Sequence, residues 1–241
     1  MTATQLHWIQ ATDAPDAFPD ICTAMPEPNG LLAAGGDLSE ARLLAAYSRG
    51  IFPWFDDGQP ILWWSPDPRC VLLPAQFHTS RRLRRNLRRR DFTVSFNASF
   101  DDVIEACALP RDGQDGTWIT ADMSHAYRHL HRRGWAHSVE VWREDELVGG
   151  LYGLAIDRVF FGESMFSAAS DASKAAMLEL CRVLASAGFA LLDGQVASAH
   201  LLSLGATLLP RDEFKAILQS ECREAVSFSG WPEGRNELCL P

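Results

Sequence analysis

Three strand-like segments joined by short polar turns constrain the fold of this chain more than any other feature of its sequence. They cover residues 137–142, 147–155 and 159–166, and the turns between them read Arg-Glu-Asp-Glu and Ile-Asp-Arg. Apolar segments that are joined in this way are typical of neighbouring antiparallel strands. We therefore predict an antiparallel meander in the second half of the chain.

Helices and strands alternate on both sides of this meander. After it, apolar spacing predicts a helix that begins at Asp171 or Ser173 and ends at Gly188. A strand, a helix, a strand and a helix are then predicted at residues 189–193, 198–204, 206–209 and 212–219. Before the meander, two strands and two helices are predicted at residues 69–73, 93–96, 99–108 and 122–133. The pattern predicts an α+β fold.

The N-terminal part is expected to be a separate and less regular domain. A change of composition near residues 113–116 predicts a boundary, with an N-terminal domain at 1–113 and a second domain at 114–241. The first seventeen residues are expected to be loosely ordered, and a helix capped by Asp37 or Ser39 should end at Gly50. Prolines separate the aromatic residues that follow: Phe52, Trp54, Phe55, Trp63 and Trp64.

Composition excludes several classes of protein. With 241 residues, 47% hydrophobic and 22% charged, the chain can bury a core and is too apolar to be disordered. Its apolar stretches fall far short of the roughly 18 residues that span a bilayer, and no basic segment with an apolar core begins the chain. We therefore expect a cytoplasmic protein with no membrane partner. The six cysteines form no C-x-x-C pair, so we expect them to be reduced, mostly buried and not bound to a metal.

Positive charge is concentrated in one short segment. Seven of the ten residues from Arg81 to Arg90 are arginine, and removing their charge from the net −9 leaves −16 for the rest of the chain. On a helix capped by Thr79 or Ser80, Leu83 and Leu87 lie one turn apart, and the opposite face carries Arg81, Arg82, Arg84, Arg85, Arg88 and Arg89. A basic run is often only a solvated face, but arginine can bind a phosphate through two parallel hydrogen bonds. We predict that this face contacts nucleic-acid phosphates.

Two acidic residues lie on strands that should be buried. Glu163 is flanked by apolar residues on a strand that we expect to be central, where an acid is costly unless it has a role. Asp193 ends an apolar strand, at the edge where α/β sheets bind ligands, and its spacing from Gln195 can point both side chains the same way. The alternative for Asp193 is an Asx turn or a helix cap.

Several tryptophans lie among loops that are rich in proline and glycine. The four in question are Trp54, Trp63, Trp64 and Trp118. The usual place of a tryptophan is the core. In a chain with an arginine helix, however, an unpaired base can stack on such a ring for about 1–3 kcal/mol. We expect stacking from one or two of the eight tryptophans and burial of the others.

Nine segments, taken in order along the chain, resemble the motifs of one bacterial enzyme family. They read GLLAAGGDLS, YSRGIFPWF, ILWWSPDPR, GTWIT, HSVEVW, ELVGGLYG, FFGESMFS, LLDGQV and HLLSLGA. Together they span nearly all of residues 18–218 and resemble the leucyl/phenylalanyl-tRNA–protein transferases. The resemblance implies transfer of Leu or Phe, and less well Met, from aminoacyl-tRNA to proteins with an N-terminal Arg or Lys. Such proteins then enter the N-degron pathway of degradation.

The resemblance also implies the fold and the chemistry. It implies a GNAT-like acyltransferase domain at residues 114–241 and a smaller N-terminal α/β domain. The acyl donor is an ester on the terminal ribose of the tRNA, so no metal and no cofactor is needed, and we expect a monomer. Asp193 and Gln195 correspond to the D-x-Q pair at the reaction centre, and Glu163 to the acid of the G-E-S-M-F motif.

The remaining residues that correspond to family positions concern the donor. Trp54 and Trp118 correspond to aromatic residues around the 3′-terminal adenosine. Leu151, Phe160 and Met165 match positions that line the aminoacyl pocket, although some members have Met in place of Leu151. Because the ester is already activated, positioning should supply most of the acceleration.

The expected roles at the reaction centre follow from this chemistry. Asp193 should orient Gln195 and draw in the cationic N-terminus of the acceptor protein. Gln195 either accepts a hydrogen of the attacking amine or only aligns that amine.

Two other functions fit parts of the sequence. A non-catalytic RNA-binding module would use the arginine helix and leave Asp193 and Glu163 with structural roles. An acetyl-CoA-dependent acyltransferase of the same fold would need a Q/R-x-x-G-x-G/A loop at the start of the helix after the meander. This chain has Ser-Ala-Ala-Ser-Asp-Ala-Ser-Lys there, which disfavours coenzyme A.

Overall fold

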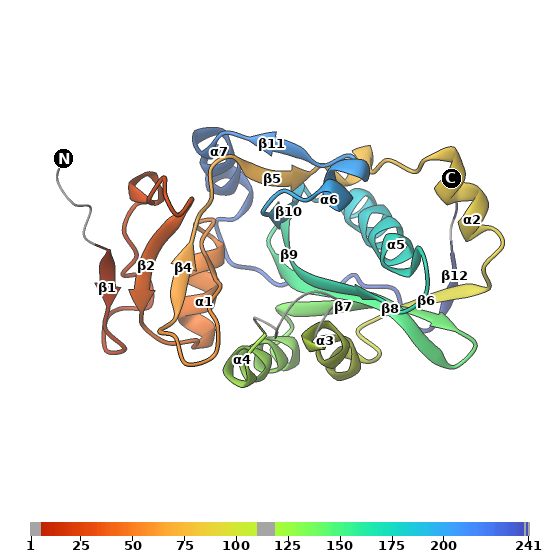
Figure 1. The fold of residues 1–241 in the computed structure, drawn as a ribbon, viewed down its shortest axis with the longest axis horizontal. Helices are drawn as coiled ribbons and strands as arrows, with labels where there is room; N and C mark the ends of the chain where they lie inside the picture. The colour runs from red at the N-terminus through yellow and green to blue at the C-terminus, as the bar shows by residue number, and fades with distance from the viewer. Residues whose placement is uncertain (1–5, 110–118, 239, 241) are drawn as a thin grey trace.

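A computed structural model describes residues 6–109, 119–238 and 240, which fold around two β-sheets (Figure 1). The smaller sheet holds β1 (His7–Ile9), β2 (Leu31–Gly35), β3 (Phe52–Pro53) and β4 (Leu62–Trp64). Its strand order is β1-β2-β4-β3, with β1 parallel to β2 and the other pairs antiparallel. Helix α1 (Glu40–Tyr47) begins after Ser39, which is the N-cap of the two residues predicted. The short helix η1 (Ile21–Thr23) precedes β2.

The larger sheet contains the predicted meander. Its strands are β5 (Arg69–Leu72), β6 (Phe92–Phe96), β7 (Ala136–Arg143), β8 (Glu146–Ile156), β9 (Val159–Ser167), β10 (Leu191–Gln195), β11 (Thr207–Leu209) and β12 (Asn236–Glu237). They lie in the order β11-β5-β10-β9-β8-β7-β6-β12. The antiparallel pairing of β7 with β8 and of β8 with β9 confirms the meander, and β10 pairs with β9 in parallel.

Helices cover both faces of the larger sheet (Figure 1). They are α2 (Arg81–Leu87), α3 (Phe100–Ala108), α4 (Ala121–Arg132), α5 (Ala172–Ser186), α6 (Ala199–Ser203) and α7 (Arg211–Glu221), with the short helix η2 (Pro74–Gln76). One hydrophobic core joins α3, α4 and α7 to the smaller sheet, and a second core surrounds α5. The α+β class is confirmed. Within the described residues, no helix is long and apolar enough to cross a membrane.

The larger sheet extends across the predicted domain boundary at residue 113. β5 and β6 precede that residue, yet β5 pairs with β10 and β11, and β6 pairs with β7 and β12. All four residues of β5 are buried, and the strand lies inside the sheet between β11 and β10. A change in the polarity of a sequence does not show where a sheet ends.

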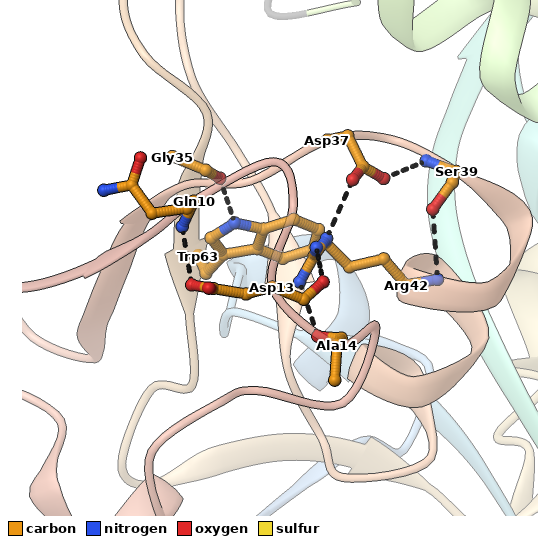
Figure 2. Close-up of polar contacts among 8 residues, drawn as sticks. All are labelled: Gln10, Asp13, Ala14, Gly35, Asp37, Ser39, Arg42 and Trp63. Carbon is orange, nitrogen blue, oxygen red and sulfur yellow. Dashed lines mark hydrogen bonds and ion pairs between the residues drawn. The ribbon is translucent and has the colours of Figure 1, made fainter.

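The residues after β1 are more ordered than predicted. Arg42 of α1 is only 1% exposed, and its guanidinium donates to the carbonyl oxygens of Asp13 and Ala14 at 3.0 and 3.2 Å (Figure 2). The same group forms an ion pair with Asp37 at 3.3 Å. The expectation of loose order is therefore wrong for residues 7–17, because a buried cation that lies far along the chain supplies their contacts.

Candidate active site

The candidate site lies where β9 and β10 separate. Their parallel pairing ends at Phe161 and Asp193, and Glu163 and Gln195 lie on the continuations of the two strands. A cavity of about 870 Å³ opens at this point, and Glu163 and Gln195 both line it. Two strands that part in this way leave room for a ligand beyond the carboxyl ends of the paired segments.

Glu163 is the centre of a hydrogen-bond network that joins distant parts of the chain. The hydroxyls of Tyr47 on α1 and Tyr127 on α4 donate to its Oε1 and Oε2 at 2.8 and 2.9 Å. The two hydroxyl oxygens also lie within hydrogen-bond distance of each other, and with one hydrogen each they can bond only when one of them does not donate to Glu163. Gln195 Nε2 donates to Glu163 Oε1 at 2.8 Å. The prediction that Glu163 lies on a central strand is confirmed, because β9 lies between β8 and β10.

Burial gives Glu163 an unusually high pKa, which the hydrogen-bond network partly offsets. Burial raises its pKa to about 7, although hydrogen bonds from Tyr47 and Tyr127 favour the charged form. Burial, together with the charge of Glu163, raises the pKa of both tyrosine hydroxyls well above their ordinary value. The site therefore combines a carboxyl that changes charge near neutral pH with two hydroxyls that remain protonated. Such perturbed groups in a cavity are typical of functional sites.

Asp193 forms a buried ion pair with Arg69 of β5. Nε and Nη2 of Arg69 lie 2.8 and 2.7 Å from the two carboxylate oxygens, and Asp193 has no exposed surface. The rings of Phe52 and Phe214 pack against the guanidinium, with centroids 4.9 and 4.8 Å from Cζ. Asp193 Oδ1 also accepts the backbone N–H of Gln195 at 2.9 Å. The ion pair thus fixes the backbone that carries Gln195.

This geometry corrects two expectations about Asp193. A bulge separates Asp193 from Gln195, and Gln195 has a φ of +59°, so the simple two-residue alternation of a strand does not apply to them. Asp193 also cannot draw in a cationic N-terminus, because it is buried and its charge is paired with Arg69. The Asx turn proposed as the alternative is present, whereas the next helix is capped by Ser198.

Part of the cavity wall is apolar. Leu151 on β8 and Phe160 on β9 are 3% and 0% exposed and line the cavity together with Met165. The three residues predicted for the aminoacyl pocket therefore lie around the same cavity as Glu163 and Gln195. Their role in binding a side chain stays a prediction.

The tryptophans divide between core and surface. Trp63 is fully buried, and its indole nitrogen donates to the carbonyl oxygen of Gly35 at 2.9 Å (Figure 2). Trp54 is 45% exposed, lines the cavity and has its ring centroid 5.7 Å from that of Trp64. Trp118, the second tryptophan predicted to lie near the adenosine, falls outside the described residues.

The arginine segment forms the predicted amphipathic helix. α2 begins after Ser80, whose hydroxyl accepts the N–H of Leu83 at 3.1 Å, and both Leu83 and Leu87 are buried. Arg84 is half-buried, whereas the other predicted phosphate ligands are exposed: Arg81, Arg82, Arg85, Arg88 and Arg89. Contact of this face with phosphates stays a prediction.

Three residues that bond to Glu163 or Asp193 were not among the site residues predicted from the sequence: Tyr47, Tyr127 and Arg69. Tyr47 and Tyr127 lie on the buried stripes of two helices, where a hydroxyl needs a partner, and Arg69 begins a buried strand, where a cation needs a counter-charge. The need for partners could be inferred from the sequence. The partners themselves could not, because Tyr47 lies 116 residues from Glu163 and Arg69 lies 124 residues from Asp193.

Comparison with protein families identifies the same enzyme family along most of the chain. Residues 71–219 match the family described as leucyl/phenylalanyl-tRNA protein transferase. Residues 36–67 match the N-terminal domain of that family. Residues 68–70 lie between the two matches. The match to residues 71–219 therefore begins within β5, which is the first strand of the larger sheet along the chain.

Curated relatives agree with the family match. A leucyl/phenylalanyl-tRNA–protein transferase of Saccharophagus degradans is 52% identical over 235 residues, which cover 96% of each chain. One of Pseudomonas aeruginosa is 59% identical over 214 residues, covering 89% of this chain and 94% of the relative. Among solved structures, a conserved protein of Staphylococcus epidermidis has a TM-score of 0.38 at 13% identity, over 75% of this chain and 68% of its own. That likeness is too low to identify the fold, so the GNAT-like organisation stays a prediction. The sequence matches, in contrast, are extensive, and the chain is an aminoacyltransferase that belongs to the leucyl/phenylalanyl-tRNA protein transferase family.

Proposed function

We propose that this protein transfers leucine or phenylalanine, and less readily methionine, from aminoacyl-tRNA to the amino group of an N-terminal Arg or Lys. The modified acceptors are marked for degradation by the N-degron pathway. One observation carries the proposal: a single cavity joins an apolar wall to the pair formed by Glu163 and Gln195. The protein works without a cofactor, as a monomer in the cytoplasm, and residues 114–241 form a GNAT-like domain whose sheet is completed by β5 and β6. The meander followed by α5 and β10 supports that fold.

The apolar wall suits the side chain of the donor. Leu151, Phe160 and Met165 present only hydrocarbon and a thioether to the cavity, so a leucine, phenylalanine or methionine side chain would be transferred from water to an apolar surface. These three side chains are unbranched at Cβ and can bend beyond it into a narrow slot. Isoleucine and valine carry their bulk at Cβ, where the slot begins. A missing methylene changes binding by only about 1–3 kcal/mol, so selection against them must be steric.

The polar side of the cavity suits the acceptor amine. When Glu163 is charged it can only accept hydrogen bonds, so the NH₂ of Gln195 faces it. Gln195 Oε1 is then left to accept a hydrogen bond from the attacking amine. An amide oxygen is a very weak base, so Gln195 aligns the amine and does not remove its proton. Asp193 supports this by holding the backbone of Gln195 and is a positioning residue.

The reaction forms one bond and breaks one. The free α-amine, whose ordinary pKa is about 8, is neutral in a useful fraction of molecules at physiological pH. Its lone pair attacks the ester carbonyl carbon of the aminoacyl-tRNA, a peptide bond forms, and the bond from that carbon to the ribose oxygen breaks. The proton lost by the amine ends on the ribose oxygen. Glu163, with its pKa of about 7, is the nearest carboxyl able to carry that proton in transit.

The tRNA would contact the protein at two places. Trp54 is an exposed ring at the edge of the cavity, where the 3′-terminal adenosine can stack, and Trp118 is proposed as its partner. The exposed arginines of α2 would bind phosphates of the acceptor stem. The acidic remainder of the protein would repel RNA and confine it to this surface.

The direct test is transfer of radiolabelled leucine from Leu-tRNA to a reporter protein that begins with Arg. We expect transfer to this reporter and to one that begins with Lys, none to one that begins with Gly, and none when acetyl-CoA replaces the tRNA. In competition, equimolar Ile-tRNA should be used very poorly, and Met165→Ala should admit it. Comparable transfer from Leu-tRNA and Ile-tRNA by the wild-type protein would refute the slot.

A further inference from the structure

The segment after α7 is fastened to the larger sheet at both of its ends. The Asp157 carboxylate, in the turn between β8 and β9, accepts the backbone N–H groups of Glu224, Ala225 and Val226 at 2.9, 3.1 and 2.7 Å. Further on, β12 pairs with β6 and forms the edge of the sheet (Figure 1). We call residues 223–238 the C-terminal strap. The strap lies beyond the family match, which ends at residue 219.

Trp231 is the central contact of the C-terminal strap. Its ring stacks on Phe96 of β6 at 5.7 Å between centroids and lies 4.5 Å from the ring of His137 on β7. Phe228 packs edge-on against it at 4.9 Å, and the indole nitrogen donates to the carbonyl oxygen of Phe228 at 3.0 Å. The indole is therefore held by contacts on several sides.

Trp231 also contacts Phe160, which lines the cavity of the candidate site. The two rings meet edge to face, with centroids 6.2 Å apart and planes at 73°. Phe160 is fully buried and belongs to the cavity wall, whereas Trp231 is not among the described residues that line the cavity. Trp231 thus contacts Phe160 without lining the cavity itself.

A second contact fixes the Phe160 ring from β8. A Cβ atom placed on Gly153 would lie 2.6 and 2.8 Å from two carbons of that ring, so the ring rests directly on the glycine backbone. Protein interiors are packed densely, and a ring held between a backbone and an indole has little room to shift. Gly153 and Trp231 therefore both restrict the position of this part of the cavity wall.

We propose that Trp231 of the C-terminal strap sets the size of the donor side-chain slot, and with it the preference between donors, by holding Phe160 in place. The inference rests on the proposed function, because it assumes that the apolar wall binds the donor side chain. Trp231 is a positioning residue and touches no reacting group. Replacing it with alanine leaves space behind Phe160, into which the ring can retreat, and the slot becomes larger. A larger slot favours phenylalanine over leucine.

The test compares kcat/KM for Phe-tRNA and Leu-tRNA in the full chain. We expect Trp231→Ala to raise the Phe-to-Leu ratio roughly three- to tenfold, a change of the size that small differences in pocket volume produce. The change should appear in KM more than in kcat, and Trp231→Phe should restore most of the wild-type ratio. The matched control is Trp142→Ala, which removes a buried tryptophan on β7 that packs against Arg235 of the same strap. That variant should lose stability and keep the wild-type ratio.

The outcomes separate this inference from the proposed function. A folded Trp231→Ala protein with an unchanged ratio would overturn the inference, as would an equal change in Trp142→Ala. If Trp231→Ala does not fold, Trp231→Leu, which removes the ring but keeps apolar volume, gives the same comparison. If the wild-type protein transfers neither amino acid, the proposed function fails. Binding of leucyl- and phenylalanyl-adenosine analogues with an amide in place of the ester then measures the slot directly, and an unchanged binding ratio in Trp231→Ala would again overturn the inference.

Discussion

At Glu163, burial and hydrogen bonding act on one carboxyl in opposite directions. Burial disfavours the charge, while the hydroxyls of Tyr47 and Tyr127 and the amide of Gln195 favour it. Burial dominates, and the pKa rises from 4.5 to about 7. The folded protein therefore binds this proton more tightly than the unfolded chain does. Stability associated with Glu163 is fully present below pH 4.5 and is lost as the pH rises through about 7.

Glu163→Gln should remove this pH dependence. The variant should unfold with nearly the wild-type free energy at pH 5 and be more stable than wild type at pH 8, by up to about 3 kcal/mol at 1.36 kcal/mol per pKa unit. Transfer activity should fall at the same time. Urea unfolding at the two pH values measures the effect, with the exposed Glu146→Gln as control. A stability difference that does not vary with pH would contradict the assigned cause.

The buried ion pair between Arg69 and Asp193 makes the stability of the protein depend on two single side chains. Both side chains are at most 1% exposed, so removing one leaves an uncompensated buried charge. Arg69→Met and Asp193→Asn should each lower the free energy of unfolding by about 3–5 kcal/mol. The double variant should lose clearly less than the sum of the two, and neither single variant should keep full transfer activity, because the backbone of Gln195 loses its support.

A double-mutant cycle measured by urea unfolding tests the coupling. The same cycle on Arg235 and Asp145, an exposed pair at 3.0 Å, should give less than about 1 kcal/mol. Additive effects at Arg69 and Asp193 would show that the two side chains do not depend on each other.

Among the helices, α2 is short, and few of its side chains are buried. Its seven residues bury only Leu83 and Leu87, and Asn86 fastens the helix to Asp171 at 3.0 Å, so most of the arginines face solvent. Such a helix contributes little apolar area to the core. Its exposed arginines are therefore available to a partner, and they can be changed without disturbing the rest of the fold.

Arg81→Ala, Arg85→Ala and Arg88→Ala together should weaken tRNA binding and flatten its dependence on salt. Each lost phosphate contact lowers the slope of log K against log salt by about one, so the slope should drop by about two to three. Binding titrations between low and high salt measure this, with the melting temperature as a check on folding. The control replaces three exposed arginines elsewhere: Arg132, Arg158 and Arg223. An equal loss of slope in the control would assign the effect to net charge alone.

For the whole molecule, one of the two hydrophobic cores contains residues of both sheets. Tyr47 and Trp63 from the N-terminal part pack in the same cluster as Tyr127, Phe161 and Phe214 from the rest of the chain. Neither part buries its apolar surface without the other. We therefore expect the chain to unfold as one cooperative unit despite its two sheets.

Arg42→Met tests this expectation, because Arg42 of α1 holds the N-terminal loop through two backbone carbonyl groups. It should lower the free energy of unfolding by about 1.5–3 kcal/mol, because it removes the hydrogen bonds of a buried charged group to Asp13 and Ala14, whereas Asp37 is 36% exposed and stays solvated. Tryptophan fluorescence and far-UV circular dichroism should still give one coincident transition. Arg49→Met, which breaks an ion pair whose side chains are 45% and 63% exposed, should cost less than about 1 kcal/mol. Two separate transitions would show that the sheets are independent.

The sequence by itself determined the elements whose pattern is local. The meander, the helices α3 to α5 and the amphipathic α2 follow from apolar spacing and capping residues within each segment. The family motifs brought Glu163, Gln195 and the three apolar residues of the cavity wall together before any contact was known. β1 and β2 were missed, because their pairing depends on partners elsewhere in the chain.

Only the tertiary structure decided how the candidate site is held. It shows that Asp193 pairs with Arg69 and accepts the backbone N–H of Gln195. It also shows that Tyr47 and Tyr127, on two separate helices, both donate to Glu163. It also shows that strands on both sides of residue 113 form one sheet. The local pattern of apolar residues predicts which residues are buried, because the buried face of a helix or strand follows its apolar periodicity. That pattern does not predict which buried polar groups bond to each other, because such pairs depend on how elements more than a hundred residues apart pack together.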